Sequence, residues 1–169
     1  MLSMNKKTDY ALLALSYLTR IEPGRTANTK EIAEQHDLPV ELLAKIMQIL
    51  AKARLVVSTS GPTGGYRLAK PAAEISVGAI IEIIEGRPAL AQCMRSVDNV
   101  CGQHDKCTIR TPMMRINARI FQMLDHVSLA EINGEDEPQM HSANVEMLSA
   151  RPQLSQNRNL PIREAAGSR

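Results

Sequence analysis

The sequence predicts a mainly α-helical fold with a small β-hairpin, in which a winged helix-turn-helix is followed by a long dimerisation helix. Apolar residues make up 44% of the 169-residue chain and aromatic residues only 2%, so aliphatic side chains and methionines must form the core, which favours helices. Three amphipathic stretches precede a hairpin pattern, and another long amphipathic stretch comes later. Together these observations give the order of elements in the predicted fold.

Two helices are predicted before residue 38. Asn5 is placed to cap the first helix, and Pro23 with Gly24 ends it. The second helix begins at Asn28 or Thr29 and ends near residues 36–37. The apolar residues of the first helix fall on one stripe at helical spacing: Tyr10, Leu13, Ala14, Tyr17, Leu18 and Ile21.

A third helix is predicted to begin at Leu38 and Pro39, with the proline at the first helical position. Its broad buried face contains six apolar residues: Leu42, Leu43, Ile46, Met47, Ile49 and Leu50. Residues 55–59 and 66–68 have strand character, and the loop between them is rich in Gly, Pro, Ser and Thr. This loop lacks the spacing and the Lys-Ser/Thr of a P-loop, so we interpret it as a wing. Residues 1–75 are thus a predicted winged helix-turn-helix DNA-binding domain.

Ser76 is placed to cap a fourth helix over residues 77–85, which Gly86 ends. The long helix that follows has Thr111 as its expected cap and Pro112 in its first turn. A narrow apolar seam runs along it: Met113, Ile116, Ile120, Met123, Leu124 and Val127. Such a seam favours packing against a second copy of the chain, and packing within one chain is the alternative. Residues 76–132 are therefore the predicted cluster-binding loop and dimerisation helix, and the polar stretch 133–169 is a predicted disordered tail.

The only cysteines, Cys93, Cys101 and Cys107, all lie in one polar segment. An odd number of thiols is a poor disulfide framework, and the wide spacing lacks the close pairs of a structural zinc site. Thiolates at such spacing suit an iron–sulfur cluster, while zinc and redox-active or idle thiols are the alternatives. A cluster normally needs a fourth ligand, for which His104, Asp105 or a distant carboxylate such as Asp9 are candidates.

Charge is unevenly distributed along the chain. Residues 1–71 contain ten Lys/Arg and six Asp/Glu, whereas the remaining residues contain ten and twelve. A basic N-terminal half indicates an anionic partner such as DNA, with a protein-binding winged-helix module as the alternative. Ten residues are predicted to contact DNA: Thr29, Lys30, Val40, Glu41, Ala44, Lys45, Gln48, Thr59, Ser60 and Thr63. Among these, Lys45 suits guanine, Gln48 adenine and Glu41 the amino group of cytosine.

No apolar run is long enough to span a membrane, and the first residues lack the apolar region of a secretory signal. We therefore expect a cytoplasmic protein that makes no contact with membranes, where thiols stay reduced and available to metal.

Five motifs resemble the Rrf-two family of bacterial regulators, over about Ser3 to Ile132. These are Thr8-Asp9-Tyr10-Ala11, Glu31-Ile32-Ala33-Glu34, residues 61–69, Ile75-Ser76-Val77 and the three-cysteine segment. Within the family, residues 107–110, 115–117 and 127–132 are most similar to regulators of the SUF iron–sulfur assembly operon.

The resemblance implies a homodimeric repressor, not an enzyme, that binds a palindromic operator and controls SUF-type assembly genes. It implies one iron–sulfur cluster per subunit on Cys93, Cys101 and Cys107, with 2Fe–2S and 4Fe–4S types both open. IscR-type members have a histidine three residues after the third cysteine, where this chain has Arg110. The NsrR type uses an aspartate of the first helix, donated by the partner subunit, and Asp9 matches it.

Two departures prevent transfer of the operator sequence from the IscR type, which has a glutamate where this chain has Ala44 and an arginine where it has Ser60. A nitric-oxide-sensing NsrR-type repressor is the main alternative function. A thiol-redox enzyme with Cys93 as nucleophile is a weaker one, because the chain lacks a C-x-x-C pair and an evident base. The last alternative is a winged-helix module that holds no cluster and binds another protein.

Overall fold

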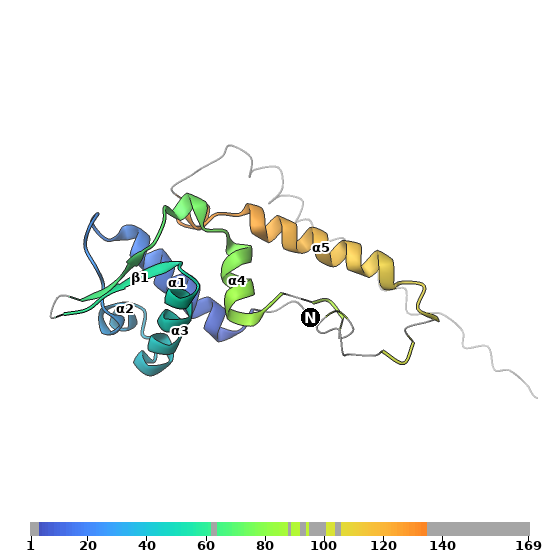
Figure 1. Ribbon diagram of the computed structural model, residues 1–169, viewed down its shortest axis with the longest axis horizontal. Coiled ribbons are helices and arrows are strands. Elements are labelled where there is room, and N and C mark those ends of the chain that lie inside the picture. Colours follow the sequence, from blue (N-terminus) through green and yellow to red (C-terminus); the bar gives the residue numbers. More distant parts are fainter. Residues whose placement is uncertain are drawn as a thin grey trace, which may run out of the picture. The chain divides into compact units, whose positions relative to one another are not determined.

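The computed structural model describes residues 4–61, 64–87, 89–91, 94, 101–103 and 106–134. Within these residues the fold is mainly helical with one two-stranded antiparallel hairpin, which confirms the predicted fold class (Figure 1). The elements in chain order are α1 (Lys6–Arg20), α2 (Thr29–Gln35), α3 (Val40–Lys52), β1 (Val56–Thr59), β2 (Gly65–Leu68), the 3-10 helix η1 (Ala72–Glu74), α4 (Val77–Glu85), α5 (Arg110–His126) and α6 (Leu129–Ile132).

Side-chain caps fix the starts of three helices as predicted. Asn5 accepts hydrogen bonds from backbone N–H groups in the first turn of α1, Asn28 does so for α2, and Ser76 for α4. The predicted starts of the other two long helices are wrong, by one residue for α3 and by two for α5. Pro39 is the N-cap of α3 rather than its first residue, and α5 begins at Arg110, ahead of Thr111. Neither start has a side-chain cap, so packing fixes it.

The core lies where α1, α3 and α4 meet, and α2, the hairpin and α6 close it. Its largest fully buried side chains are aliphatic: Leu15, Ile32, Leu43, Ile46, Met47, Leu50, Ile75, Ile80 and Leu129. Two predicted core positions are wrong, because Leu13 and Ile49 are each 38% exposed. The buried arc of α1 instead centres on Ala11, Leu15 and Leu18, since α1 contacts α3 on one side and α4 on another.

The base of the wing is joined to the segment before α2. Strands β1 and β2 pair from Val56 opposite Leu68 to Thr59 opposite Gly65. Ala27 extends this ladder, because its N–H donates to the Tyr66 carbonyl at 3.0 Å and its carbonyl accepts from Tyr66 N–H at 2.8 Å. A Cβ on Gly65 would lie 2.6 Å from the Ala27 carbonyl carbon, so this approach requires glycine.

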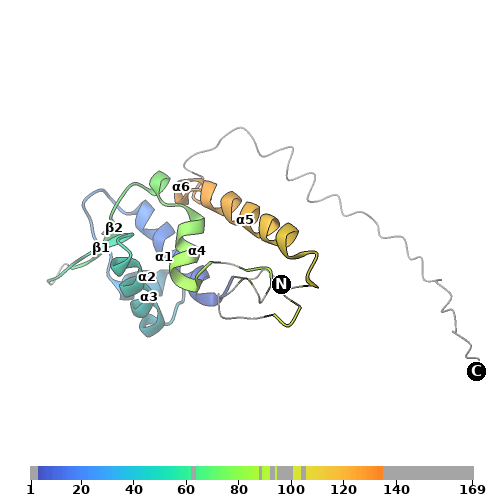
Figure 2. The ribbon, with the colours of Figure 1, turned by 45° about the vertical axis from the view of Figure 1, so that its right-hand side comes forward.

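The end of α5 is fixed to the start of α4. The Ser76 hydroxyl donates to Asp125 at 2.7 Å, and Val77 N–H donates to the Val127 carbonyl at 2.8 Å. At Gly78 the two helices approach so closely that a Cβ would lie 2.9 Å from the Cα of Asp125. α6 follows α5 directly (Figure 2) and begins with a capping box of Ser128 and Glu131.

Residues 135–169 lie outside the described part, so the tail stays a prediction. Asn133, at its predicted start, donates hydrogen bonds to the Thr19 hydroxyl and the Leu129 carbonyl, both at 3.0 Å. None of the described helices combines the length and the apolar character needed to cross a lipid bilayer.

Candidate nucleic-acid interface and cysteine segment

α3 presents its predicted base-reading side chains on one exposed face. Glu41, Lys45 and Gln48 are exposed, Val40 is 44% exposed, and Ala44 is half-buried. The opposite face of the helix is fully buried in the core. This face therefore offers a cationic donor, an amide that both donates and accepts, and a carboxylate acceptor, which are the groups that recognise base edges.

The other described residues that are predicted to contact DNA lie on or beside α2 and β1, two elements that both contact α3. Lys30 is exposed and forms a loose ion pair with Glu34 at 3.6 Å, and Thr29 beside it is half-buried. Thr59 and Ser60 are exposed at the outer end of β1, whereas Thr63 lies outside the described residues. Because Ala27 pairs with Tyr66, the wing and the start of α2 are held in one register relative to each other.

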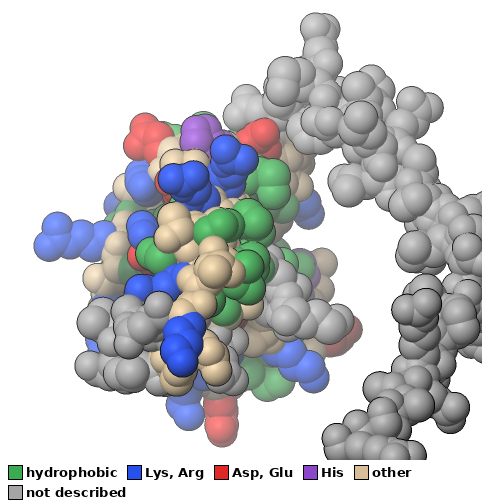
Figure 3. Space-filling model, turned by 90° about the vertical axis from the view of Figure 1, so that its right-hand side faces the viewer, with side chains coloured by type: hydrophobic (Ala, Val, Ile, Leu, Met, Phe, Trp, Pro, Cys, Tyr) green, Lys and Arg blue, Asp and Glu red, His purple; other side chains and the backbone are tan. Residues whose placement is uncertain are grey.

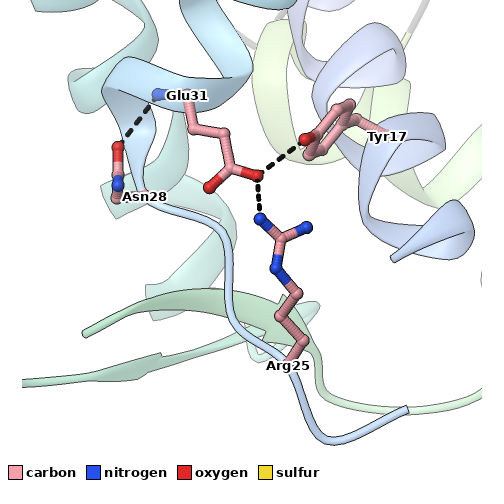
Figure 4. Close-up of polar contacts among 4 residues, drawn as sticks. All are labelled: Tyr17, Arg25, Asn28 and Glu31. Carbon is pink, nitrogen blue, oxygen red and sulfur yellow. Dashed lines mark hydrogen bonds and ion pairs between the residues drawn. The ribbon is translucent and has the colours of Figure 1, made fainter. Parts of the chain in front are cut away.

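A polar network around Glu31 connects α1 with α2 (Figure 4). The Tyr17 hydroxyl and the Arg25 guanidinium both donate to Glu31 Oε1, at 2.7 and 2.6 Å, and Glu31 N–H donates to Asn28. The hydrogen bond to Glu31, with burial and the charge of the carboxylate, raises the pKa of Tyr17. Sequence reasoning missed this network, although a tyrosine on an apolar stripe signals that its hydroxyl needs a partner.

Two of the three cysteines lie in the described part of the chain, and both are free thiols. Cys101 is exposed and Cys107 is half-buried, while Cys93, His104 and Asp105 lie outside the described residues. Within the described part, no three His, Cys, Asp or Glu side chains are close enough to hold a metal ion. Cys101 and Cys107 fit an iron–sulfur cluster by their chemistry, because each offers a sulfur that is in no disulfide.

Asp9 lies in the first turn of α1 and is exposed, as a ligand donated to another subunit would have to be. The turn that contains it is held by Glu85, the last residue of α4. Glu85 Oε1 accepts from Asn5 N–H at 2.8 Å and from the Thr8 hydroxyl. Thr8 is 0% exposed and is the one buried polar residue recorded among the described residues.

The start of the cysteine segment is attached to α5 by two contacts. The Arg87 guanidinium lies over the Phe121 ring, 4.8 Å from its centroid, and Leu90 N–H donates to the Asn117 side chain at 3.0 Å. The contacts of Glu85, Phe121 and Asn117 were not predicted from the sequence. These residues have no spacing pattern in common, because their contacts join segments far apart in the chain.

α5 leaves apolar side chains uncovered. None of its residues is buried, and Met114, Ile116 and Met123 are 51%, 46% and 63% exposed. The other seam residues, Met113, Ile120, Leu124 and Val127, are half-buried. Figure 3 faces the end of the molecule where α5 starts and shows hydrophobic side chains at the surface among Lys and Arg. An exposed apolar helix face of this kind is typical of a surface that binds a partner.

The sequence model of a family described as Rrf2, "Iron-dependent Transcriptional regulator", matches residues 4–135. Among curated proteins, the chain is 33% identical over 136 residues to the "HTH-type transcriptional regulator NsrR" of Oceanobacillus iheyensis, covering 80% of this chain and 92% of that one. It is 29% identical over 131 residues to the protein of the same name from Geobacillus kaustophilus, covering 78% and 89%.

Solved structures of two regulators have the same fold. T. potens IscR has a TM-score of 0.62 and 26% identity, covering 82% of this chain and 91% of that one. CymR, the global cysteine regulator of B. subtilis, has a TM-score of 0.63 and 24% identity, covering 81% of this chain and 100% of that one.

Proposed function

The chain belongs to the Rrf2 family of iron-dependent transcriptional regulators, and we propose that it is a repressor of SUF-type iron–sulfur assembly genes that senses iron–sulfur cluster supply. It is a transcriptional regulator and not an enzyme. The observation that carries the proposal is the concentration of all three cysteines in one segment. This segment follows α4, and Arg87 and Leu90 just ahead of the first cysteine contact α5.

In this proposal Cys93, Cys101 and Cys107 hold the cluster, and Asp9 of the partner subunit completes the site. The free thiols at Cys101 and Cys107 and the exposed carboxylate of Asp9 support this ligand set. When bound, the cluster supplies a cross-link that depends on iron supply and is destroyed by oxidants. The site needs reduced thiols, which places the protein in the cytoplasm.

The dimer forms through the exposed apolar face of α5, where Ile116 and Met123 lie. Two α3 helices then face successive major grooves of a palindromic operator. Because Arg87 and Leu90 attach the cysteine segment to α5, a change in that segment acts on the helix that sets the spacing of the two α3 helices. Cluster binding regulates DNA only if it stabilises the DNA-competent arrangement more than the other one.

The test is an absorbance spectrum with iron and sulfide assays on anaerobically purified protein. We expect the wild type to be coloured and Asp9→Ala to lose most of the colour. The three cysteine variants should lose operator binding together with the cluster: Cys93→Ala, Cys101→Ala and Cys107→Ala. Colour that persists in Asp9→Ala would move the fourth ligand to His104 or Asp105. A wild type without iron after reconstitution, or alanine variants that regulate normally, would refute the proposal.

A nitric-oxide-sensing repressor is the second candidate. The relatives named NsrR, at 33% and 29% identity, support it, as does Asp9. Operator release by the loaded protein separates the two functions. If an iron chelator releases the protein from its operator faster than stoichiometric nitric oxide does, the result supports the assembly regulator. If nitric oxide acts faster, the result supports the nitric oxide sensor.

A further inference from the structure

Glu85 connects two parts of the chain that have separate tasks in the proposed cluster site. It ends α4, and its carboxylate accepts hydrogen bonds from Asn5 N–H at 2.8 Å and from the Thr8 hydroxyl. Asn5 caps α1, so Glu85 places a negative charge at the N-terminus of that helix, where the helix dipole favours it. Glu85 therefore fixes the start of α1 from a position 80 residues away in sequence.

The contact with Thr8 has few substitutes. Thr8 is 0% exposed with Glu85 in place, so its hydroxyl depends on the Glu85 carboxylate as its partner in this arrangement. A buried hydroxyl without a partner is costly, which favours arrangements in which Glu85 and Thr8 stay together. The first turn of α1 and the last turn of α4 are thus expected to move as one unit.

This unit carries Asp9 at one end and the start of the cysteine segment at the other. Asp9 follows Thr8 directly, and Gly86 follows Glu85 directly. Beyond Gly86, Arg87 and Leu90 are held against α5 by Phe121 and Asn117. A displacement of the cysteine segment at its start is therefore transmitted through Glu85 to the turn that presents Asp9.

We propose that the Glu85–Thr8 hydrogen bond couples the two cluster sites of the dimer. The inference rests on the proposed function, in which a subunit binds one cluster with its own cysteines and gives Asp9 to the cluster of its partner. Under that arrangement, the Glu85–Thr8 unit joins the cysteines of one site to the fourth ligand of the other. Occupation of one site favours occupation of the second, and the coupling is reciprocal.

Native mass spectrometry of partly loaded dimers tests this coupling. Dimers are equilibrated anaerobically with limiting iron and sulfide, and species with no, one and two clusters are counted. Independent sites give the binomial distribution. We expect the wild type to depart from it toward empty and doubly loaded dimers, with a coupling factor of about fivefold or more.

Two variants remove the hydrogen bond, and two others keep it. Thr8→Val keeps the volume and burial but loses the donor, and Glu85→Ala loses the acceptor. We expect both to give the binomial distribution. Thr8→Ser and Glu85→Gln retain a donor and an acceptor, so the coupling should stay near the wild-type value. Thermal unfolding of the metal-free proteins shows which variants fold, and Thr8→Val still tests the loss of the hydrogen bond if Glu85→Ala does not fold.

Glu74→Ala is the matched control, because Glu74 is an exposed glutamate of η1 whose carboxylate makes no hydrogen bond or ion pair with another residue in the described part of the chain. It should retain the coupling. A binomial distribution in the wild type, or wild-type coupling in folded Thr8→Val and Glu85→Ala, would overturn the inference while leaving the proposed function intact. A wild type without a cluster would overturn both. Asp9→Ala with a full cluster would overturn the inference and move the fourth ligand of the proposed site to His104 or Asp105, so the failures are distinguishable.

Discussion

α3 and α5 are both long amphipathic helices, yet the chain covers only one of them. α3 buries Leu43, Ile46 and Met47 completely and exposes its polar face, whereas α5 buries none of its residues. α3 is therefore stabilised by its own subunit and is free to present side chains to a ligand. α5 keeps an apolar face uncovered, and its attachments lie at its C-terminal end and along the side that faces α4. The exposed face of α3 is therefore a preformed surface for binding DNA, whereas the exposed apolar face of α5 is suited to be covered by another molecule.

The largest expected effect is that of truncating a side chain on the buried face of α3, which tests whether α3 is stabilised by its own subunit. Leu43→Ala removes a side chain that is 0% exposed and leaves a cavity, so the free energy of unfolding should fall by about 2–5 kcal/mol. Leu13→Ala, at a position 38% exposed, is the matched control and should cost clearly less. Urea unfolding measures both, and equal losses would contradict the burial described here.

The attachment of α5 can be tested at Gly78. A Cβ at this position would lie 2.9 Å from the backbone N and Cα of Asp125, so Gly78→Ala must push α5 away from α4. We expect a loss of about 1–3 kcal/mol in the free energy of unfolding of the metal-free protein. Gly102→Ala is the control, since no described residue apart from its chain neighbours lies within 4 Å of a Cβ there. A variant at Gly78 as stable as this control would refute the close approach.

The uncovered face of α5 can be tested with a charge. Ile116→Glu is expected to weaken self-association by about tenfold or more, because it places a carboxylate in an apolar contact. Val57→Glu, at a position 38% exposed on β1, should leave association unchanged. Analytical ultracentrifugation measures both, and undiminished association of the Ile116 variant would move the dimer contact elsewhere.

The smallest expected effect concerns the Glu31 network behind the reading surface. Tyr17→Phe removes one hydrogen bond, at a cost of about 0.5–1.5 kcal/mol in the free energy of unfolding. The pKa of Tyr17 is raised in the folded state, so its contribution is fully present below the ordinary value of 10.0 and is lost as pH rises through the folded value.

Above pH 10.0 the wild type should therefore lose stability more steeply than Tyr17→Phe. Tyr10→Phe serves as the control, because the Tyr10 hydroxyl makes no side-chain hydrogen bond in the described part of the chain. Parallel pH profiles for the wild type and the Tyr17 variant would show that the phenol does not depend on Glu31.

Local signals in the sequence predicted most of the fold. The caps Asn5 and Ser76, Asn28 as one of two candidate caps, the hairpin and the order of α1 to α5 were predicted, because caps and turns depend on residues only two or three positions apart. The short helices η1 and α6 were not predicted. The same motifs led to the family, which the comparisons confirm. The cluster ligands, the DNA contacts and the dimer stay predictions.

The tertiary structure decided which faces are buried and which segments meet. Periodicity predicted an apolar stripe through Leu13, but the buried arc of α1 follows the directions from which α3 and α4 approach. The contacts of Glu85 with Thr8, of Gly78 with Asp125 and of Ala27 with Tyr66 join residues 39 to 77 positions apart. Sequence spacing holds no record of such pairs, since chain folding alone brings them within reach. Local chemistry thus determined the helices and strands of this protein, and packing determined which of them contact one another.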